Sequence, residues 1–235
     1  AFGYLCSSLY GYIKLFKQEN IPLRMEIGFE EIAKTIKSAR SVYKLNIIRK
    51  GQNIIEVLLI GLILNERQAG LFFAAMLTTV LPTIAIGLLN TLIVRKYIVL
   101  ANNGERSELW AISRKYNRLI TLITAPYLIG TIIHPQWIEI ILGSQYQGLE
   151  SIIRIMTFGQ VVNIFFCGGL ASLVTALNLE KRAVSYQIIS VTIFIITAFL
   201  LGKFYGANGL ASSIVATVTL NKMLQARMVK RELLL

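Results

Sequence analysis

The chain has 235 residues, of which 55% are hydrophobic and 15% are charged, and its 24 lysines and arginines against 12 acidic residues give a net charge of +12. Soluble domains carry about 25% charged residues, so this composition excludes an ordinary soluble domain. The apolar runs are roughly 20 residues long, the length of a transmembrane helix and too long for the strands of a membrane barrel. We therefore expect an all-α polytopic membrane protein.

The beginning of the chain predicts an incomplete helix followed by a loop. The largely apolar run before Lys14 is 13 residues long, shorter than a span needs, so residues 1–16 are predicted to be the end of a transmembrane helix. The sequence is accordingly expected to be a fragment of a longer protein or a truncated product. Residues 17–44 are basic, and apolar side chains recur there at three- and four-residue spacing. This pattern predicts a cytoplasmic loop with an amphipathic interfacial helix, or an extension of the next span.

Residues 45–235 are predicted to form a bundle of six transmembrane helices, with "KFYGANG", residues 203–209, as a tight turn between the last two. With residues 17–44 placed in the cytoplasm, lysines and arginines alternate between loops as the positive-inside rule requires. This alternation predicts a cytoplasmic C-terminus, and it fits membrane topology better than nucleic-acid binding. The helices are expected at about residues 42–64, 68–94, 119–133, 149–177, 183–202 and 210–228, with a polar loop at 95–118.

The first helix of this bundle, "KLNIIRKGQNIIEVLLIGLIL" at residues 44–64, carries a polar stripe. At about 100° per residue, its polar side chains share an arc of about 120°, with Gln52 at the border. Charged groups in lipid are costly, so we predict that the stripe faces a polar cavity open to the cytoplasm. The alternative is that the cations reach the headgroups. The candidate substrate-binding residues are Arg49, Lys50 and Asn53, and Glu56 is a candidate coupling or ion-pair group.

Arg154 is a further candidate for substrate binding, at the outer mouth of the cavity. Glu150 precedes it by four residues, so a self-neutralised ion pair at the outer interface is the alternative.

Several kinds of chemistry lack their residues in this sequence. There is no aspartate, the one histidine, His134, lies in a short outer loop, and Cys6 and Cys167 lie in apolar runs. No acid–base pair, clustered metal ligands or GxxxxGK[ST] motif is present. We therefore expect no catalytic residues, no metal, no cofactor and no ATP-driven pump.

Three segments carry a resemblance to a known family. They are "LNERQAGLFFAAMLTTVLP" (64–82), "IEIILGSQYQGLESIIRIM" (138–156) and "KFYGANGLASSIVATVTLNKMLQARMVKR" (203–231). In this order and spacing they resemble the C-terminal half of bacterial polysaccharide flippases for O-antigen and capsule. These belong to the superfamily of MATE drug exporters and lipid II flippases.

The resemblance implies two six-helix bundles related by pseudo-two-fold symmetry. Residues 1–16 would end the sixth helix, residues 17–44 would link the bundles, and residues 45–235 would be the second bundle. The implied activity is translocation of undecaprenyl-diphosphate-linked oligosaccharide across the bacterial inner membrane by alternating access. The implied partners are this lipid-linked oligosaccharide, membrane lipids, a missing N-terminal six-helix half and a polysaccharide polymerase. A MATE-type drug or cation antiporter, a membrane polysaccharide polymerase or ligase, and a non-transporting fragment are the alternatives.

Overall fold

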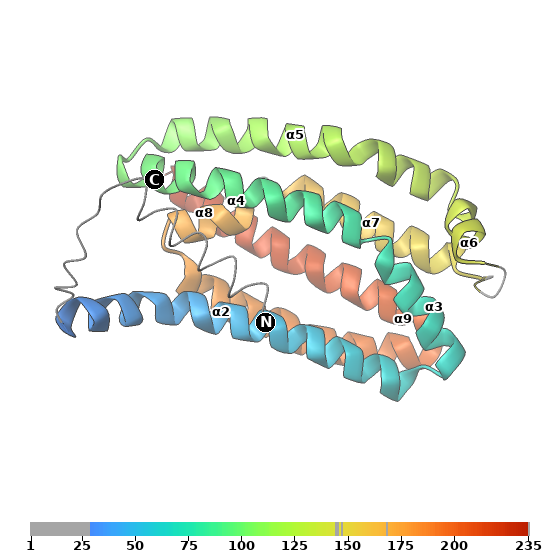
Figure 1. The fold of residues 1–235 in the computed structure, drawn as a ribbon. Helices are drawn as coiled ribbons and strands as arrows, with labels where there is room; N and C mark the ends of the chain where they lie inside the picture. The colour runs from blue at the N-terminus through green and yellow to red at the C-terminus, as the bar shows by residue number, and fades with distance from the viewer. Residues whose placement is uncertain (1–28, 144–145, 147, 168, 235) are drawn as a thin grey trace, which may run out of the picture. The chain divides into compact units, whose positions relative to one another are not determined.

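The computed structural model of the protein describes residues 29–143, 146, 148–167 and 169–234. The predicted helix end at 1–16 and residues 17–28 of the predicted loop lie outside these ranges. Within them the chain is helical and has no β-strand, which confirms the predicted all-α class. The helices are α2 (Phe29–Ile63), α3 (Glu66–Leu77), α4 (Val80–Asn102), α5 (Arg106–Ile133), α6 (Gln136–Leu142), α7 (Glu150–Cys167), α8 (Leu170–Ala176) and α9 (Glu180–Leu234) (Figure 1).

The chain divides into two compact units, Ala1–Ala39 and Arg40–Leu235. In the first unit the structure describes the beginning of α2, in the region where the sequence predicts an amphipathic helix. The second unit contains the rest of α2 and all the other helices.

The predicted span at 68–94 is broken into α3 and α4 at Thr78 and Thr79. Pro82 has no backbone N–H with which to bond the carbonyl of Thr78, four residues earlier, so the helix cannot continue unchanged. Tyr127 of α5 donates its hydroxyl to that carbonyl at 2.7 Å. Compensation by a neighbouring helix is what makes proline tolerable in a membrane helix. The same bond joins α5 to the break between α3 and α4.

The predicted polar loop at 95–118 is wrong. Helix α4 continues to Asn102 and α5 begins at Arg106, so only residues 103–105 leave the helical conformation. Basic side chains do not end a helix, because their long stems lie along it while the charges reach water or headgroups. At its other end α5 meets the short helix α6 at 87°.

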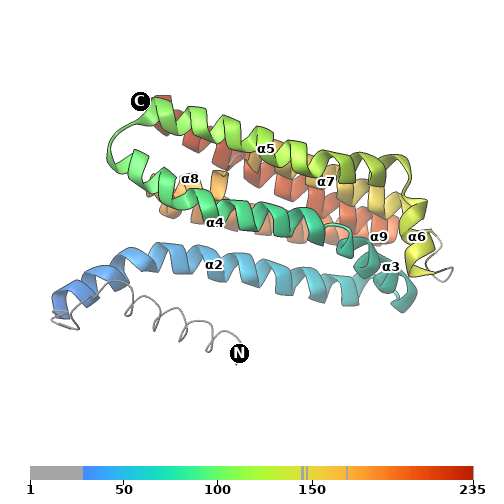
Figure 2. The same ribbon diagram turned by 45° about the horizontal axis from the view of Figure 1, so that its top comes forward.

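Helix α9 doubles back on itself at Gly206. This residue has φ 57° and ψ −135°, a conformation that glycine adopts without steric penalty. Asn221 donates to Gln187 at 2.7 Å, although these residues would lie about 51 Å apart in a straight helix. An ion pair between Arg182 and Glu232, at 3.5 Å, spans the same reversal. Residues 180–205 and 207–234 are therefore two antiparallel helices, here called the first and second limbs of α9 (Figures 1 and 2).

Three helical stretches of the described residues are long and apolar enough to cross a membrane: Glu66–Asn102, Glu150–Ala176 and Glu180–Leu233. The bent pair formed by α5 and α6 makes a fourth if it is one span. These apolar helices support a membrane protein. They are fewer than the six spans predicted, because α9 counts once although it reverses, and because α2 carries the charged stripe.

Buried apolar side chains of the described residues form three clusters; one joins α4, α5 and α7 and includes Ile86, Ile120 and Ile164, and the other two lie toward opposite ends of α2 and of the limbs of α9. The first apolar cluster lies near the Gly206 reversal and includes Ile60, Phe72, Phe194, Leu210 and Ala211. The second apolar cluster lies toward the opposite ends of α9 and includes Leu45, Tyr97, Leu173, Ala183 and Val229. Each of α2, the first limb and the second limb contributes to both clusters, so the residues between them on these three helices occupy a level of their own.

Candidate functional site

Polar side chains fill the level between the first and second apolar clusters. On α2, Gln52 lies between Leu45 and Ile60 and is buried. The first limb supplies buried Gln187 and Ser190 between Ala183 and Phe194, and the second limb supplies a longer row between Ala211 and Met228. We call this set the polar layer; its members are Gln52, Gln187, Ser190, Ser213, Thr217, Asn221 and Gln225.

Four amide side chains of the polar layer form one hydrogen-bonded chain that ends on a carboxylate. Gln225 Nε2 donates to Asn221 Oδ1 at 3.0 Å, and Asn221 Nδ2 donates to Gln187 Oε1 at 2.7 Å. Gln187 Nε2 then donates to Gln52 Oε1 at 2.7 Å, and Gln52 Nε2 donates to Glu56 Oε1 at 2.9 Å. Each amide donates to the next, so the chain has a direction, and it joins the second limb, the first limb and α2 in series.

A cavity of about 190 Å³ lies beside this amide chain. Its lining includes the cations Arg49 and Lys222 together with Gln187, Ser190 and Gln225. Gln225 Oε1 and Ser190 Oγ are buried and have no hydrogen-bond partner among the described residues. Because buried polar atoms are normally satisfied by protein or by water, this small polar cavity is the place where a polar ligand or water would complete their hydrogen bonding.

The structure divides the predicted polar stripe of α2 between two sides of the helix. Arg49 and Glu56 are half-buried and turn toward the polar layer with Gln52, whereas Lys50 and Asn53 are exposed. The side of α2 that packs into the bundle is thus centred on Gln52, which the helical wheel had placed at the border of the stripe. The orientation follows from the partners: Gln187 Nε2 donates to Gln52 Oε1 at 2.7 Å, and apolar Leu45 and Ile60 are buried on the same side.

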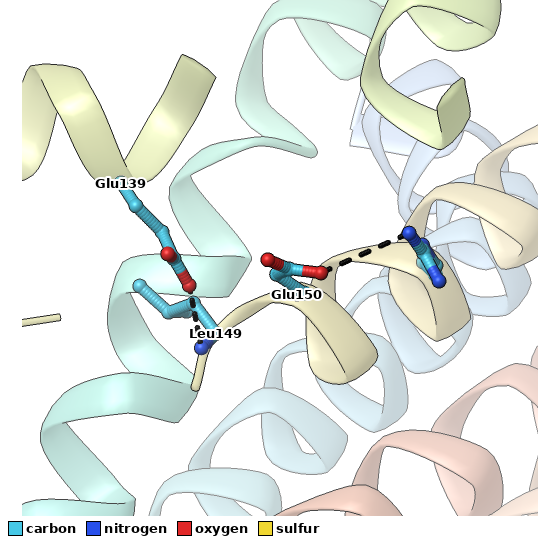
Figure 3. A network of polar contacts seen from close by, with 4 residues as sticks. Glu139, Leu149 and Glu150 are labelled. Atoms are coloured by element: carbon cyan, nitrogen blue, oxygen red, sulfur yellow. Dashed lines mark hydrogen bonds and ion pairs between the residues drawn. The ribbon is translucent and has the colours of Figure 1, made fainter. Parts of the chain in front are cut away.

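Arg154 does not join the other candidate residues. It pairs with Glu150 at 3.8 Å, the contact drawn as a dashed line from Glu150 in Figure 3. Both side chains are substantially exposed, and such a pair contributes about 0–1 kcal/mol. Ser151 bonds Asn208, which places the start of α7 beside the Gly206 reversal. Gln187 is 19 residues before Gly206, roughly 28 Å along the first limb, so Arg154 and the amide chain lie at different levels of the bundle.

The first turn of α7 is held by a second carboxylate. Glu139 of α6 accepts the backbone N–H of Leu149 at 3.1 Å, one residue before Glu150 (Figure 3). An acceptor at a helix N-terminus satisfies a donor that has no partner within the helix. Glu139 therefore has a structural explanation, and it is not part of the polar layer.

Sequence reasoning overlooked most of the polar layer. It did not single out Gln187, Asn221 or Gln225, because amide side chains in membrane helices also serve as ordinary hydrogen-bonding groups between helices. A signal was present in the final helix, where Ser213, Thr217, Asn221 and Gln225 recur at intervals of four and therefore share one face. Among the described residues no group of three histidine, cysteine or acidic side chains is placed to hold a metal ion.

The fold and the polar layer define the class as a helical membrane protein that buries an amide network between two apolar clusters. A family model for polysaccharide biosynthesis proteins matches residues 1–151, more than half of the chain. The chain belongs to the polysaccharide biosynthesis protein family. Comparison with curated proteins and with solved structures finds no match. The family match includes Arg49, Gln52 and Glu56 of α2 and ends before the two limbs of α9.

Proposed function

We propose that the chain is the second bundle of a flippase that translocates undecaprenyl-diphosphate-linked oligosaccharide across the bacterial inner membrane. Membership of the polysaccharide biosynthesis family and the apolar helices support this proposal. In it the six crossings are α2, α3 with α4, α5 with α6, α7 with α8, and the two limbs of α9. The C-terminus is cytoplasmic, the other half of the transporter is an N-terminal six-helix bundle, and no enzymatic step is assigned to the chain.

The observation that carries the proposal is the amide chain from Gln225 to Glu56, which lies between the first and second apolar clusters. Placing polar groups in a membrane interior costs free energy, and such groups commonly mark the pathway of a substrate or ion. Here they connect α2 to both limbs of α9, and Gln187 and Gln52 make the bond between α9 and α2. A hydrogen bond between two helices can form in one arrangement of the helices and break or change partner in another. Alternating access requires two such discrete arrangements.

The direction of the amide chain gives Glu56 a role in coupling. In the structure every amide donates toward Glu56, and Gln225 Oε1 at the far end has no partner among the described residues. A protonated Glu56 would instead donate to Gln52, and each amide would turn over. The reversed chain would end with a donor to Gln225 Oε1. Arg49 and Lys222 line the adjoining cavity and would sense the same change of charge.

The two sides of α2 have different roles in this proposal. Arg49, with Gln52 and Glu56, faces the polar layer and links α2 to α9. Lys50 and Asn53 are exposed on α2 and would line the cavity shared with the N-terminal half, where a diphosphate or acidic sugar attracts cations. Arg154 would act at the outer end, as a cation partly neutralised by Glu150.

Complementation tests this function in cells. A bacterial strain without its flippase would receive the full-length protein carrying Arg49→Ala, Glu56→Ala or the control Lys203→Ala, an exposed cation beside the reversal. We expect the first two variants to lower surface glycan by about tenfold or more, equivalent to about 1.4 kcal/mol, and the control to leave it unchanged. Membrane levels of each variant would be compared by immunoblot. Normal export by both would remove Arg49 and Glu56 from the mechanism.

A further inference from the structure

A second cavity, of about 560 Å³, lies between α5, α7, α8 and the second limb of α9. Four cations line it, Arg114 and Arg118 from α5 and Arg227 and Lys230 from the second limb, and we call it the basic groove. None of these residues belongs to the polar layer. Most of the remaining lining is aromatic or aliphatic: Trp110, Phe165, Phe166, Leu170, Leu173 and Met223.

The positive charge of the basic groove is not neutralised by a carboxylate among its lining residues. The ion pairs found among the described residues, Arg154 with Glu150 and Arg182 with Glu232, use other groups. Arg114 lies over the ring of Trp110, with its guanidinium carbon 5.9 Å from the ring centroid, which fixes one cation at the wall. Four like charges around one hollow create a field that attracts an anion.

The apolar part of the basic groove continues along α5 and α7. Leu122 lies one turn beyond Arg118 and is 74% exposed. On α7, Phe165 is 72% exposed, and Phe158, about two turns further along, is 59% exposed. The two helices are tied at the level of the groove, where Asn117 donates to the carbonyl of Phe165 at 3.0 Å. Positive charge thus gives way to an exposed apolar surface within about one helical turn, roughly 5 Å.

We propose that the basic groove binds an anionic phospholipid. The phosphate would lie on the four cations, since Arg and Lys bind phosphate through charge-assisted hydrogen bonds, and the acyl chains would lie along the apolar faces of α5 and α7. A soluble anion would leave the apolar surface unexplained. An oligosaccharide would need many uncharged polar partners, and among the described lining residues only Ser113 and Asn117 are of that type. This site is distinct from the transport site proposed above and does not depend on it.

Lipid binding to the purified full-length protein tests the site directly. The probes are phosphatidylglycerol and phosphatidylcholine, which differ in headgroup charge, and bound lipid is counted by native mass spectrometry. The variant is Arg118→Gln/Arg227→Gln/Lys230→Gln; Arg114 is kept because it also packs on Trp110. The matched control is Arg95→Gln/Lys96→Gln, two exposed cations near the end of α4 that leads into α5.

We expect the wild type to retain phosphatidylglycerol in preference to phosphatidylcholine. The triple variant should lose affinity for it on the order of 100-fold, since each basic residue near a lipid surface contributes about a factor of five, and the control should stay within about twofold. Phe165→Ala should also weaken binding without any change of charge. Normal size-exclusion profiles would show that the variants are folded.

Three outcomes would overturn the proposal. The first is equal phosphatidylglycerol retention by the wild type and the triple variant. The second is that inorganic diphosphate raises the melting temperature of the protein as much as phosphatidylglycerol does, which would indicate a site for free anions. The third is displacement of phosphatidylglycerol from the groove by equimolar undecaprenyl diphosphate, which would assign the groove to the transported class of lipid.

Discussion

At the scale of single residues, the properties of the second unit depend on how amides pair inside an apolar environment. Gln187 is the central member, because it accepts from Asn221 on the second limb and donates to Gln52 on α2, 135 residues away in the sequence. The bond between α2 and α9 is therefore carried by one side chain.

Replacing Gln187 with leucine should destabilise the protein. The change keeps the size of the side chain but leaves Gln52 Oε1 and Asn221 Nδ2 without their partners, which costs about 1–3 kcal/mol. Gln136→Leu at an exposed position of α6 is the matched control and should change the stability by less than about 0.5 kcal/mol. Thermal unfolding of the purified full-length proteins would measure both. Equal melting temperatures for the two variants would show that the amide chain does not hold α2 and α9 together.

The orientation of α2 shows what could and could not be predicted at this scale. The periodicity of residues 44–64 predicts an amphipathic helix with Arg49 and Glu56 on its polar side, and the structure turns both toward the polar layer. The same wheel does not separate them from Lys50 and Asn53, which are exposed. The rotation of the helix is set by Gln187 and by the apolar clusters, which are supplied by distant parts of the chain.

At the scale of elements, glycine and proline determine where helices reverse or break. The sequence "KFYGANG" predicts a turn, and Gly206 forms the reversal of α9 within it. Breaks such as the one at Thr78 are harder to predict, because the compensating group, the Tyr127 hydroxyl, comes from another helix. The predicted loop at 95–118 failed for a related reason: charge indicates proximity to water or headgroups but does not indicate that a helix ends.

Gly206→Ala should disturb the reversal. A side chain at φ 57° and ψ −135° is strained, and a Cβ there would approach the amide of Gln68 to about 3.1 Å. We expect a loss of about 1–3 kcal/mol and a lower yield of monodisperse protein in size-exclusion chromatography. Gly51→Ala is the control, since that glycine is helical and a Cβ there meets no other atom within 4 Å; it should stabilise by up to about 1 kcal/mol. If Gly206→Ala were as stable as the control, the claim that the reversal of α9 needs a glycine at position 206 would be wrong.

At the scale of the whole molecule, the family match and the apolar helices define a membrane protein of polysaccharide biosynthesis. Composition and the length of the apolar runs predict the membrane protein, because both reflect a lipid environment, whereas polysaccharide biosynthesis is expected only from the resemblance carried by residues 64–82, 138–156 and 203–231. In the proposed function, Lys50 and Asn53 face the substrate, whereas Arg49 and Glu56 face α9. A measurement of transport is needed to test these two roles.

The most direct test is translocation by the full-length protein reconstituted in vesicles. A labelled undecaprenyl-diphosphate-linked oligosaccharide would be placed in the inner leaflet, and its appearance outside would be followed with a membrane-impermeant reagent that modifies the glycan. We predict that the wild type exposes the glycan well above the rate of empty vesicles, and that Glu56→Gln, which removes the titratable group while preserving its size, slows this at least about tenfold, equivalent to about 1.4 kcal/mol. Exposure by the wild type no faster than in empty vesicles would contradict the flippase function, and equal rates for the wild type and Glu56→Gln would separate the polar layer from transport.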